Sequence, residues 1–320
     1  MVFPQAIAVL QALFDLVGLP GNLLVIITVV LVARFHVMRY ILLASLAVSD
    51  VLFLILVNSF RIASLAQERW LYGETMCDLN PFFARYFYLN TTLHLIAVSF
   101  DRYEAIVKSP LTYDGTITKS SMAFIALIWL IPIPICIGPF LGRGKYVYNP
   151  EVFYCEQGWK TKRELNGWET TMVIAFLAVP LLVIIVLNLS VYKKAKVQIN
   201  ALAMQMGNLA GSEGQQEEDQ EKQRRLSERK AAFDVIIIIT AFLLSYLPTW
   251  IVGFCRQHIK SIEVSAPVIL VTSSIVAVNS LCNPIIYSIR KREFRTAMKN
   301  LFRRIRRCLC PISEITEEHN

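Results

Sequence analysis

Apolar residues fall along this chain in seven long stretches, separated by shorter polar segments. The stretches cover about residues 6–34, 40–66, 76–106, 119–141, 167–195, 230–257 and 263–289. Each is long enough to cross a hydrocarbon layer about 30 Å thick, which takes roughly 20 helical residues. The pattern therefore predicts an all-α membrane protein: a seven-transmembrane helix bundle over residues 6–289, whose odd number of spans puts the two termini on opposite sides.

The composition favours the same interpretation. The chain has 320 residues, of which 55% are hydrophobic and 18% charged, and its mean hydropathy is +0.49. A soluble chain of this size would need more polar surface. We find no internal repeat, which counts against transporters built from two inverted halves.

Basic residues distinguish the two sides of the membrane. Most of the 32 lysines and arginines lie in the connections after the first, third and fifth spans and after the seventh span. Cytoplasmic loops carry such an excess, so we expect these connections and the C-terminus in the cytoplasm. The N-terminus is then extracellular, with residues 1–5 as a short outer tail. The net charge of +8 indicates attraction to anionic lipid and to an acidic partner rather than to nucleic acid.

The start of the chain predicts a retained span. No basic region precedes the first apolar stretch, and no clear cleavage site of small residues follows it. A removed signal peptide would carry both features. We therefore interpret the first stretch as a membrane-spanning helix.

Two cytoplasmic segments differ from the spans. Residues 207–229 are polar and charged without apolar periodicity, and we predict a flexible intracellular loop over about 197–229. Apolar residues then recur at helical spacing among arginines over 290–307, the pattern of an amphipathic helix on the membrane surface. A cytoplasmic tail follows over 308–320. Its Cys308 and Cys310 lie close to the membrane, a setting for palmitoylation, and two free thiols are the alternative.

Two other cysteines lie on the extracellular side, where disulfides persist. Cys155 belongs to the loop before the fifth span, and Cys77 lies at the start of the third. We predict a disulfide between them, which would hold the loop at the top of the third helix. The cysteines within the spans are expected to be packing residues: Cys136, Cys255 and Cys282.

Polar side chains inside the spans mark a candidate ion site, because a polar group in hydrocarbon must face the bundle interior and find a partner. Asp50 is a carboxylate near the middle of the second span. One acid among neutral oxygens suits a weakly held monovalent cation such as sodium, or a proton, whereas tight calcium binding calls for more carboxylates. A protonated, hydrogen-bonded core acid is the alternative. The neutral partners expected around Asp50 are Thr91, Asn279, Ser280 and Asn283.

Motifs in each span resemble those of class A (rhodopsin-like) G-protein-coupled receptors over nearly the whole chain. They are "GNLLV" with Asn22, "LASLAVSD" with Asp50, "DRY" at 101–103, Trp129, Pro180, "FLLSYLP" with Phe242 and Pro248, and "NPIIY" at 283–287. Each motif alone is weak. Together, in this order, they are very specific.

The resemblance implies a plasma-membrane receptor that binds an extracellular ligand in its outer bundle and opens its cytoplasmic side to a heterotrimeric G protein. It also implies arrestin, receptor kinases and membrane lipids as partners. It implies no enzyme activity, and we find no nucleophile and base pair, metal cluster or phosphate loop in the sequence. A constitutively active, ligand-independent receptor and an ion-coupled transporter or channel are the alternatives.

The same resemblance assigns a switch at the cytoplasmic side. In such receptors the arginine of the "DRY" motif is held by the neighbouring acid and by an acid at the foot of helix six. Glu228, 20 residues before Pro248, takes the latter position and implies a latch to Arg102. The other residues implied in the switch are Asp101, Tyr103, Phe242, Tyr246, Pro284 and Tyr287. Those implied in contact with the G protein are Arg102, Pro110 and Leu111.

Some positions depart from the family pattern. Tyr246 stands where the family usually has tryptophan, and Asn188 where it commonly has tyrosine. Ala84 replaces the aspartate with which amine receptors bind an ammonium group, and Ala277 replaces the Schiff-base lysine of opsins. The resemblance therefore implies a ligand that differs from both, or an amine that reaches Glu169.

The outer third of the bundle offers arginines and aromatic residues instead. Guanidinium groups match carboxylates and phosphates, so this set predicts a neutral, anionic or amphipathic ligand. The alternative is that Arg61 and Arg85 turn outward or pair internally, for instance with Asp15 or Glu169. The candidate pocket residues are Arg61, Ala84, Arg85, Tyr88, Glu169, Met172, Tyr246, Thr249, Trp250 and Ser273.

Overall fold

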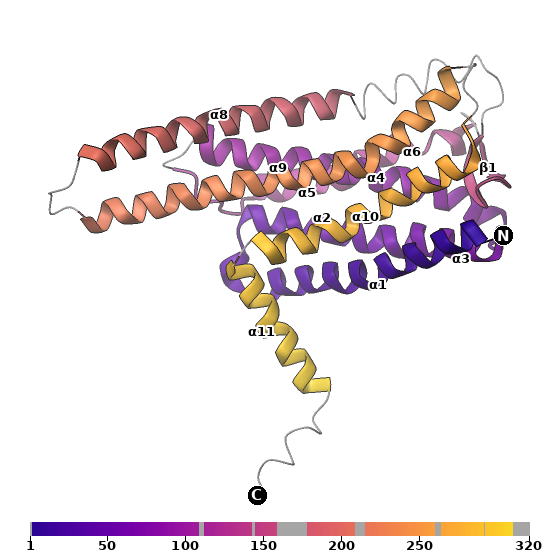
Figure 1. Cartoon of the computed structure of the whole chain (residues 1–320), viewed down its shortest axis with the longest axis horizontal. Helices are drawn as coiled ribbons and strands as arrows, with labels where there is room; N and C mark the ends of the chain where they lie inside the picture. Colours follow the sequence, from indigo (N-terminus) through magenta and orange to yellow (C-terminus); the bar gives the residue numbers. More distant parts are fainter. Residues whose placement is uncertain are drawn as a thin grey trace, which may run out of the picture.

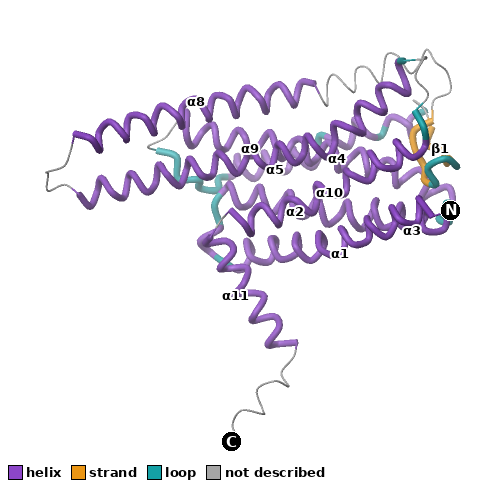
Figure 2. Tube along the Cα trace, in the orientation of Figure 1, coloured by secondary structure: helices purple, strands orange, loops and turns teal. Residues whose placement is uncertain are grey.

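The computed structural model describes residues 2–108, 112–142, 145–158, 178–208, 215–259, 264–290 and 292–309. Within these ranges the chain is almost wholly helical, and long helices lie side by side in one bundle (Figure 1). A two-stranded hairpin lies at one end of the bundle, and a last helix leaves the opposite end at an angle (Figure 2). The prediction of an all-α bundle is confirmed.

The helices follow the expected order. Those of the first half of the chain are α1 (Val2–Leu31), α2 (Met38–Phe53), α3 (Ser59–Gln67), α4 (Gly73–Tyr103), α5 (Lys119–Leu130) and α6 (Pro132–Cys136). Those of the second half are α8 (Val179–Asn208), α9 (Gln215–His258), α10 (Ala266–Arg290) and α11 (Arg292–Leu309). Short 3-10 or π-helical turns complete them: η1 (Ala33–Phe35), η2 (Leu54–Asn58), η3 (Glu104–Lys108) and η4 (Gly138–Leu141). The strands β1 (Lys145–Asn149) and β2 (Tyr154–Gly158) pair antiparallel.

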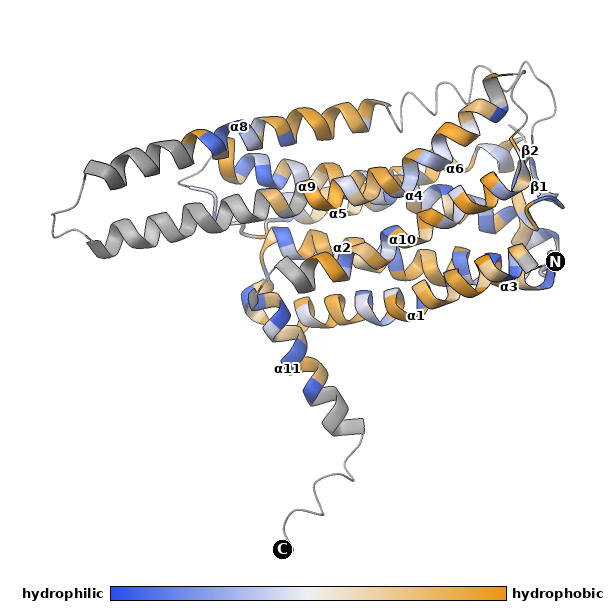
Figure 3. Cartoon of the chain, in the orientation of Figure 1, coloured by the Kyte–Doolittle hydropathy of each residue, from blue (hydrophilic) through white to orange (hydrophobic). Residues whose placement is uncertain are grey.

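Five helical segments of the described chain are long and apolar enough to cross a membrane: Phe3–Leu31, Met38–Gln67, Lys119–Leu141, Ile236–Arg256 and Ala266–Ile286. Large apolar side chains lie exposed on them, such as Leu16 (71%) and Leu244 (69%), as expected of surfaces that contact lipid. Hydrophobic residues predominate along these helices in Figure 3. The remaining two predicted spans correspond to α4 and α8, which pack against each other within the bundle.

Three boundaries differ from the sequence-based expectation. α1 begins at Val2, so residues 2–5, expected as an outer tail, are helical. α8 continues to Asn208 and α9 begins at Gln215, so most of the expected loop over 197–229 has helical backbone. The start of α9, QQEEDQEKQRR, is almost wholly polar, so no apolar face revealed it as helical from the sequence.

Two ends of the bundle matter for function. The hairpin follows η4 and lies beside the start of α4, and we call this the hairpin end. α4 has 31 residues, about 46 Å at 1.5 Å per residue, and reaches the opposite end of the bundle at Arg102. We call this opposite end the switch end. The side chains of α4 therefore connect the two candidate sites.

The motif "GNLLV" sets a close approach between α1 and α10. A Cβ atom at Gly21 would lie 2.9 Å from Cγ of Pro284, so a larger residue would push the helices apart. The adjacent Asn22 is fully buried, and its amide donates hydrogen bonds to the carbonyl oxygens of Gly18 (2.9 Å) and Ser280 (2.8 Å). The glycine permits the contact, and the asparagine holds it.

Trp129 holds the fourth span against α2 and α4. Its indole N–H donates to the hydroxyl oxygen of Ser45 at 2.9 Å, and Nε2 of the buried His94 lies 2.8 Å from the same oxygen. Asn90 and Tyr86 of α4 donate to the carbonyls of Ile128 and Trp129. These contacts satisfy polar groups that would otherwise lie unpaired in hydrocarbon.

Candidate functional site

The β1–β2 hairpin covers the hairpin end of the bundle. Its strand β2 is joined to α4 by the Cys77–Cys155 disulfide, with the two Cα atoms 5.2 Å apart, which confirms the predicted bridge. At the hairpin turn Val152 is fully buried and Tyr154 is 6% exposed. Both pack in an apolar cluster with residues of α1, α3 and α10, including Leu65 of α3. The hairpin turn is thus part of the packed bundle.

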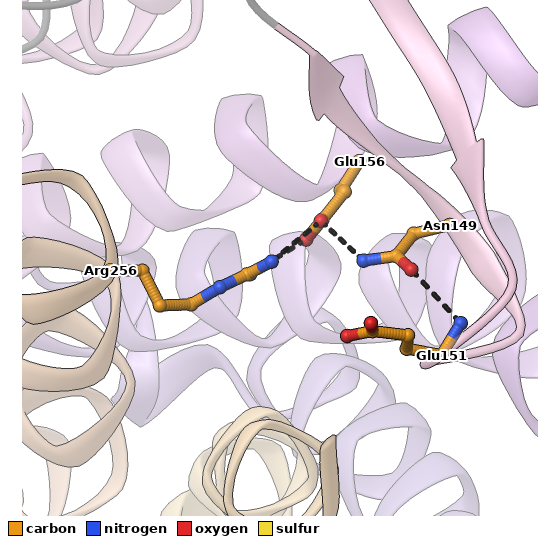
Figure 4. A network of polar contacts seen from close by, with 4 residues as sticks. All are labelled: Asn149, Glu151, Glu156 and Arg256. Atoms are coloured by element: carbon orange, nitrogen blue, oxygen red, sulfur yellow. Dashed lines mark hydrogen bonds and ion pairs between the residues drawn. The ribbon is translucent and has the colours of Figure 1, made fainter. Parts of the chain in front are cut away.

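An ion pair ties the hairpin to the end of α9. The guanidinium of Arg256 donates to both carboxylate oxygens of Glu156, at 3.3 and 3.2 Å (Figure 4). Asn149 donates to Glu156 at 2.7 Å and accepts the backbone N–H of Glu151 at 2.9 Å. These contacts fix the hairpin over α9, and our sequence analysis did not single out Glu156, whose only local signal is its position next to Cys155.

Arg61 of α3 points toward the hairpin. Its guanidinium lies 4.8 Å from the centre of the Tyr154 ring, and it interacts electrostatically with Glu156 and Tyr246. Its Nε atom is buried without a hydrogen-bond partner among the described residues. Asp15, one internal partner considered for Arg61, accepts a hydrogen bond from Asn58 at 2.8 Å. The structure therefore places an incompletely paired cation beneath the hairpin.

Arg85 has different neighbours. It is half-buried on α4 and interacts with Cys136 of α6 and with Tyr146 of β1. Burial raises the pKa of Tyr146 to about 12, and the nearby Arg85 guanidinium opposes part of that rise. The two arginines predicted for one pocket thus face different groups.

A column of aromatic rings leads from this region toward the middle of the bundle. Tyr88 of α4 lies 5.1 Å from Trp250 and 4.9 Å from Tyr246, between ring centroids, and Tyr246 lies 4.7 Å from Phe242. The pocket candidates Tyr88, Tyr246 and Trp250 are therefore in contact with the switch candidate Phe242. We call these four residues the aromatic column.

Of the other pocket candidates, Ala84 packs partly buried against the apolar core, and Ser273 hydrogen bonds with Tyr154. Thr249 donates to the carbonyl of Thr272 at 2.6 Å, so its hydroxyl belongs to the interface of α9 with α10. Glu169 and Met172 lie outside the described residues.

The structure brings Asp50 together with two of its expected partners. Ser280 Oγ donates to Oδ1 at 3.1 Å, and Asn283 Nδ2 donates to Oδ2 at 2.7 Å. Asp50 is 2% exposed, and Thr91 and Asn279 are also buried within the bundle. The acid thus lies in a polar interior region that links α2 to α10.

At the switch end, Asp101 and Arg102 form a buried ion pair. Arg102 donates to Oδ2 of Asp101 from Nε, at 3.0 Å, and from Nη2. The hydroxyl of Tyr113, in the connection before α5, donates to the other oxygen of Asp101. Asp101 and Arg102 are only 5% and 2% exposed. Tyr113 was not predicted, because nothing in its local sequence links it to a residue twelve positions earlier.

The side chain of Asn188 connects α8 to α4 near the same end. Its Nδ2 donates to Ser99 Oγ at 2.9 Å, so the asparagine that replaces the usual tyrosine makes a direct link between these helices. Tyr103 packs partly buried against the small cluster formed by Ala105, Ile106, Val191 and Ala195. Pro248 and Pro284 lie within α9 and α10.

Several predicted residues are not tested. Pro110, Leu111 and Cys310 lie outside the described residues. Glu228, Tyr287 and Cys308 lie within described helices, but their side chains fall outside the described part of the structure. The latch, the G-protein contacts and the lipidation therefore remain predictions.

This architecture defines a seven-helix membrane receptor, and comparison with known proteins gives the family. The family described as "7 transmembrane receptor (rhodopsin family)" matches residues 21–287. The chain therefore belongs to the rhodopsin family of G-protein-coupled receptors. It is a signalling receptor rather than an enzyme, and a multi-pass protein of the plasma membrane.

Individual relatives agree with this assignment. The chain is 31% identical to octopamine receptor beta-2R of Chilo suppressalis, over 88% of this chain and 75% of the relative. It is 30% identical to trace amine-associated receptor 8b of Rattus norvegicus, over 87% and 80%. It is 28% identical to melanopsin of Homo sapiens, over 89% of this chain but only 59% of the relative. The crystal structure of squid rhodopsin has a TM-score of 0.83 at 20% identity, covering 95% of this chain and 87% of the other, and shows the shared fold.

Proposed function

We propose that this receptor binds a neutral or anionic, amphipathic ligand beneath the β1–β2 hairpin and that Arg61 is the anchor for its polar group. The single observation behind this proposal is the buried Nε of Arg61, which lacks a hydrogen-bond partner among the described residues. A buried donor left unpaired is costly, and a carboxylate or carbonyl oxygen would satisfy it. The aromatic column supplies an apolar wall for the rest of the ligand.

Two relatives have amines in their names, but amine binding cannot simply be carried over to this chain. Ala84 stands where the resemblance places the ammonium-binding aspartate, and its methyl group offers no charge. An ammonium near Arg61 would also face like-charge repulsion and desolvation. We therefore propose an amine ligand only if its ammonium group reaches Glu169.

Signal transfer in this proposal runs through the aromatic column. A ligand against Tyr88 and Trp250 would alter the packing of Tyr246 and Phe242 on α9. A bend of α9 near Pro248 would then move its other end away from Arg102. We propose that the hairpin end is extracellular and the switch end cytoplasmic. Arrestin and receptor kinases are expected partners because of the family.

We also propose that Asp50 holds a sodium ion in the inactive receptor. The donor set fits: one carboxylate, whose oxygens keep lone pairs beyond the two bonds they accept, and the neutral oxygens of Ser280 and Asn283. One acid with neutral oxygens suits a monovalent ion held weakly. Bound in this region, the ion would strengthen the connection between α2 and α10.

The ligand proposal predicts that Arg61→Ala weakens anionic agonists selectively. Carboxylates, methyl esters and amines on one set of carbon skeletons should be screened with a G-protein reporter at equal surface expression. For a carboxylate agonist, loss of a charge-assisted bond should reduce potency about 10- to 150-fold, equivalent to roughly 1.5–3 kcal/mol. The ester should change far less. Arg69→Ala, at an exposed arginine beyond α3, is the matched control.

Arg85→Ala extends this experiment, because its neighbours suggest a smaller effect than that of Arg61→Ala. A monoamine that is potent on the wild type and undiminished in both Arg61→Ala and Glu169→Gln would contradict the proposed pocket. Equal losses for the carboxylate and its ester in Arg61→Ala would show that Arg61 acts on folding rather than on the ligand charge.

The latch proposal predicts that Glu228→Ala raises basal signalling. Removing a partner that Arg102 has only in the closed state costs that state about 1 kcal/mol, which shifts the population of the open state roughly fivefold. Ligand-free G-protein activation is the measurement, and Glu217→Ala in the same helix is the control. Unchanged basal activity at matched expression would exclude this latch.

The sodium proposal predicts that sodium weakens agonist binding to the wild type relative to potassium at equal ionic strength. An ion that binds the inactive state must lower the affinity for an agonist, because the agonist binds the active state. Asp50→Asn should abolish the difference. If sodium still weakens agonist binding in that variant, the ion is held elsewhere.

A further inference from the structure

A cavity of about 300 Å³ lies at the switch end, between α2, α4, α5 and the connection that carries Tyr113. It is separate from the ligand region beneath the hairpin. Residues of very different polarity line it, among them Met38, Phe100, Asp101, Glu104, Ser120 and Phe124. This mixture distinguishes the cavity from a gap in the apolar core.

One side of the cavity faces the membrane. Phe100 on α4 and Phe124 on α5 are 46% and 39% exposed. Exposed phenyl rings on neighbouring spans contact lipid, so a molecule in the bilayer can reach the cavity between them without crossing water. An occupant with a long apolar chain would lie along these rings.

The other side carries two carboxylates. Asp101 is buried and already accepts hydrogen bonds from Arg102 and Tyr113. Glu104 accepts from Lys108 at 2.9 Å, but the side chain of Lys108 is 63% exposed while that of Glu104 is 20% exposed. An exposed ion pair of this kind is worth little. Another cation can therefore replace Lys108 at Glu104 at low cost.

The capped start of α5 offers an anion in the cavity fewer donors than an uncapped helix would. Helix N-termini attract anions through unpaired N–H groups. Here Thr118 Oγ1 accepts the N–H of Ser121 at 3.1 Å, and Ser121 Oγ accepts the N–H of Thr118 in return. This capping box engages the N–H groups of Thr118 and Ser121, so an anionic headgroup would find fewer free donors here.

We propose that this cavity binds an amphiphile with a protonated amine headgroup and one long apolar chain, which enters from the adjacent leaflet of the membrane. The ammonium donates to Glu104 and lies near Asp101, and the chain runs between Phe100 and Phe124. The headgroup lies close to Asp101, the acid that pairs with Arg102. Binding of the amphiphile therefore also shifts the equilibrium between the inactive and active states of the receptor.

The experiment uses the full receptor in phosphatidylcholine nanodiscs and a long-chain primary amine that carries a photoreactive diazirine. An alcohol and a carboxylate with the same chain and diazirine are the matched probes. Cross-links are assigned to residues by mass spectrometry, with excess unlabelled amine as competitor. We expect competable labelling around Phe100 that is about tenfold stronger for the amine than for either other probe, the ratio of one charge-assisted bond.

Four variants test the position and chemistry of the site. Ser120→Trp fills the cavity from an exposed position and should remove most of the labelling, whereas Met122→Trp, at a 51% exposed residue of the same helix, should leave it unchanged. Glu104→Gln should remove the preference for the amine over the alcohol. Thr116→Trp, also at an exposed lining position, replaces Ser120→Trp if that variant does not elute as a monodisperse protein.

Equal labelling by the carboxylate or the alcohol would overturn the proposed headgroup. Equal labelling of the filled variant and of Met122→Trp would show that the probe only samples the lipid-facing surface, and would overturn the site itself. Neither result bears on the pocket beneath the hairpin, which has its own test.

Discussion

The cost of an unpaired polar group in hydrocarbon governs how this bundle is held together. Helices that pack against each other in a membrane gain little from the hydrophobic effect, because lipid tails are as apolar as their side chains. Polar contacts between helices therefore contribute a larger share of the packing energy. In this receptor the Asn22 amide joins α1 to α10, and Asp50 joins α2 to α10. Asn188 joins α8 to α4. Each contact both satisfies a buried group and sets the rotation of a helix about its axis.

The positions of side chains along α4 explain where the candidate sites lie. α4 crosses the whole bundle and carries a half-buried Arg85 in its first half and the Asp101–Arg102 pair at its end. Between them, Tyr88 belongs to the aromatic column and contacts α9. A change of packing beneath the hairpin can thus reach the switch end through side chains that already touch. The Asp101–Arg102 pair at the switch end is buried together with Tyr113, which keeps water away from it. The pair can still break when the receptor changes state.

Much of this arrangement could be predicted from the sequence. Long apolar stretches are sufficient to place spans, because the membrane sets their length. The Cys77–Cys155 bridge, and the grouping of Asp50 with Ser280 and Asn283, followed from the side of the membrane and the depth of each residue. Depth along a helix is fixed by counting residues at 1.5 Å each.

Contacts that depend on helix rotation or on loop conformation could not be predicted. Glu156 and Arg256 are 100 residues apart, and their pairing requires the hairpin to fold back over α9. Arg61 and Arg85 are both outer arginines in the sequence, yet only the structure distinguishes the one beside Tyr154 from the one beside Tyr146.

The most direct measurement is a double-mutant cycle between Asp50 and Asn283 in sodium-free buffer. The free energy of unfolding in mixed micelles is compared for the wild type, Asp50→Ala, Asn283→Ala and the double variant. If direct polar pairing between spans holds the bundle, the two substitutions should be coupled by roughly 1–2 kcal/mol. If the free-energy changes of the two single variants add up to that of the double variant within about 0.5 kcal/mol, the claim is contradicted, because additive changes mean that the two residues do not interact.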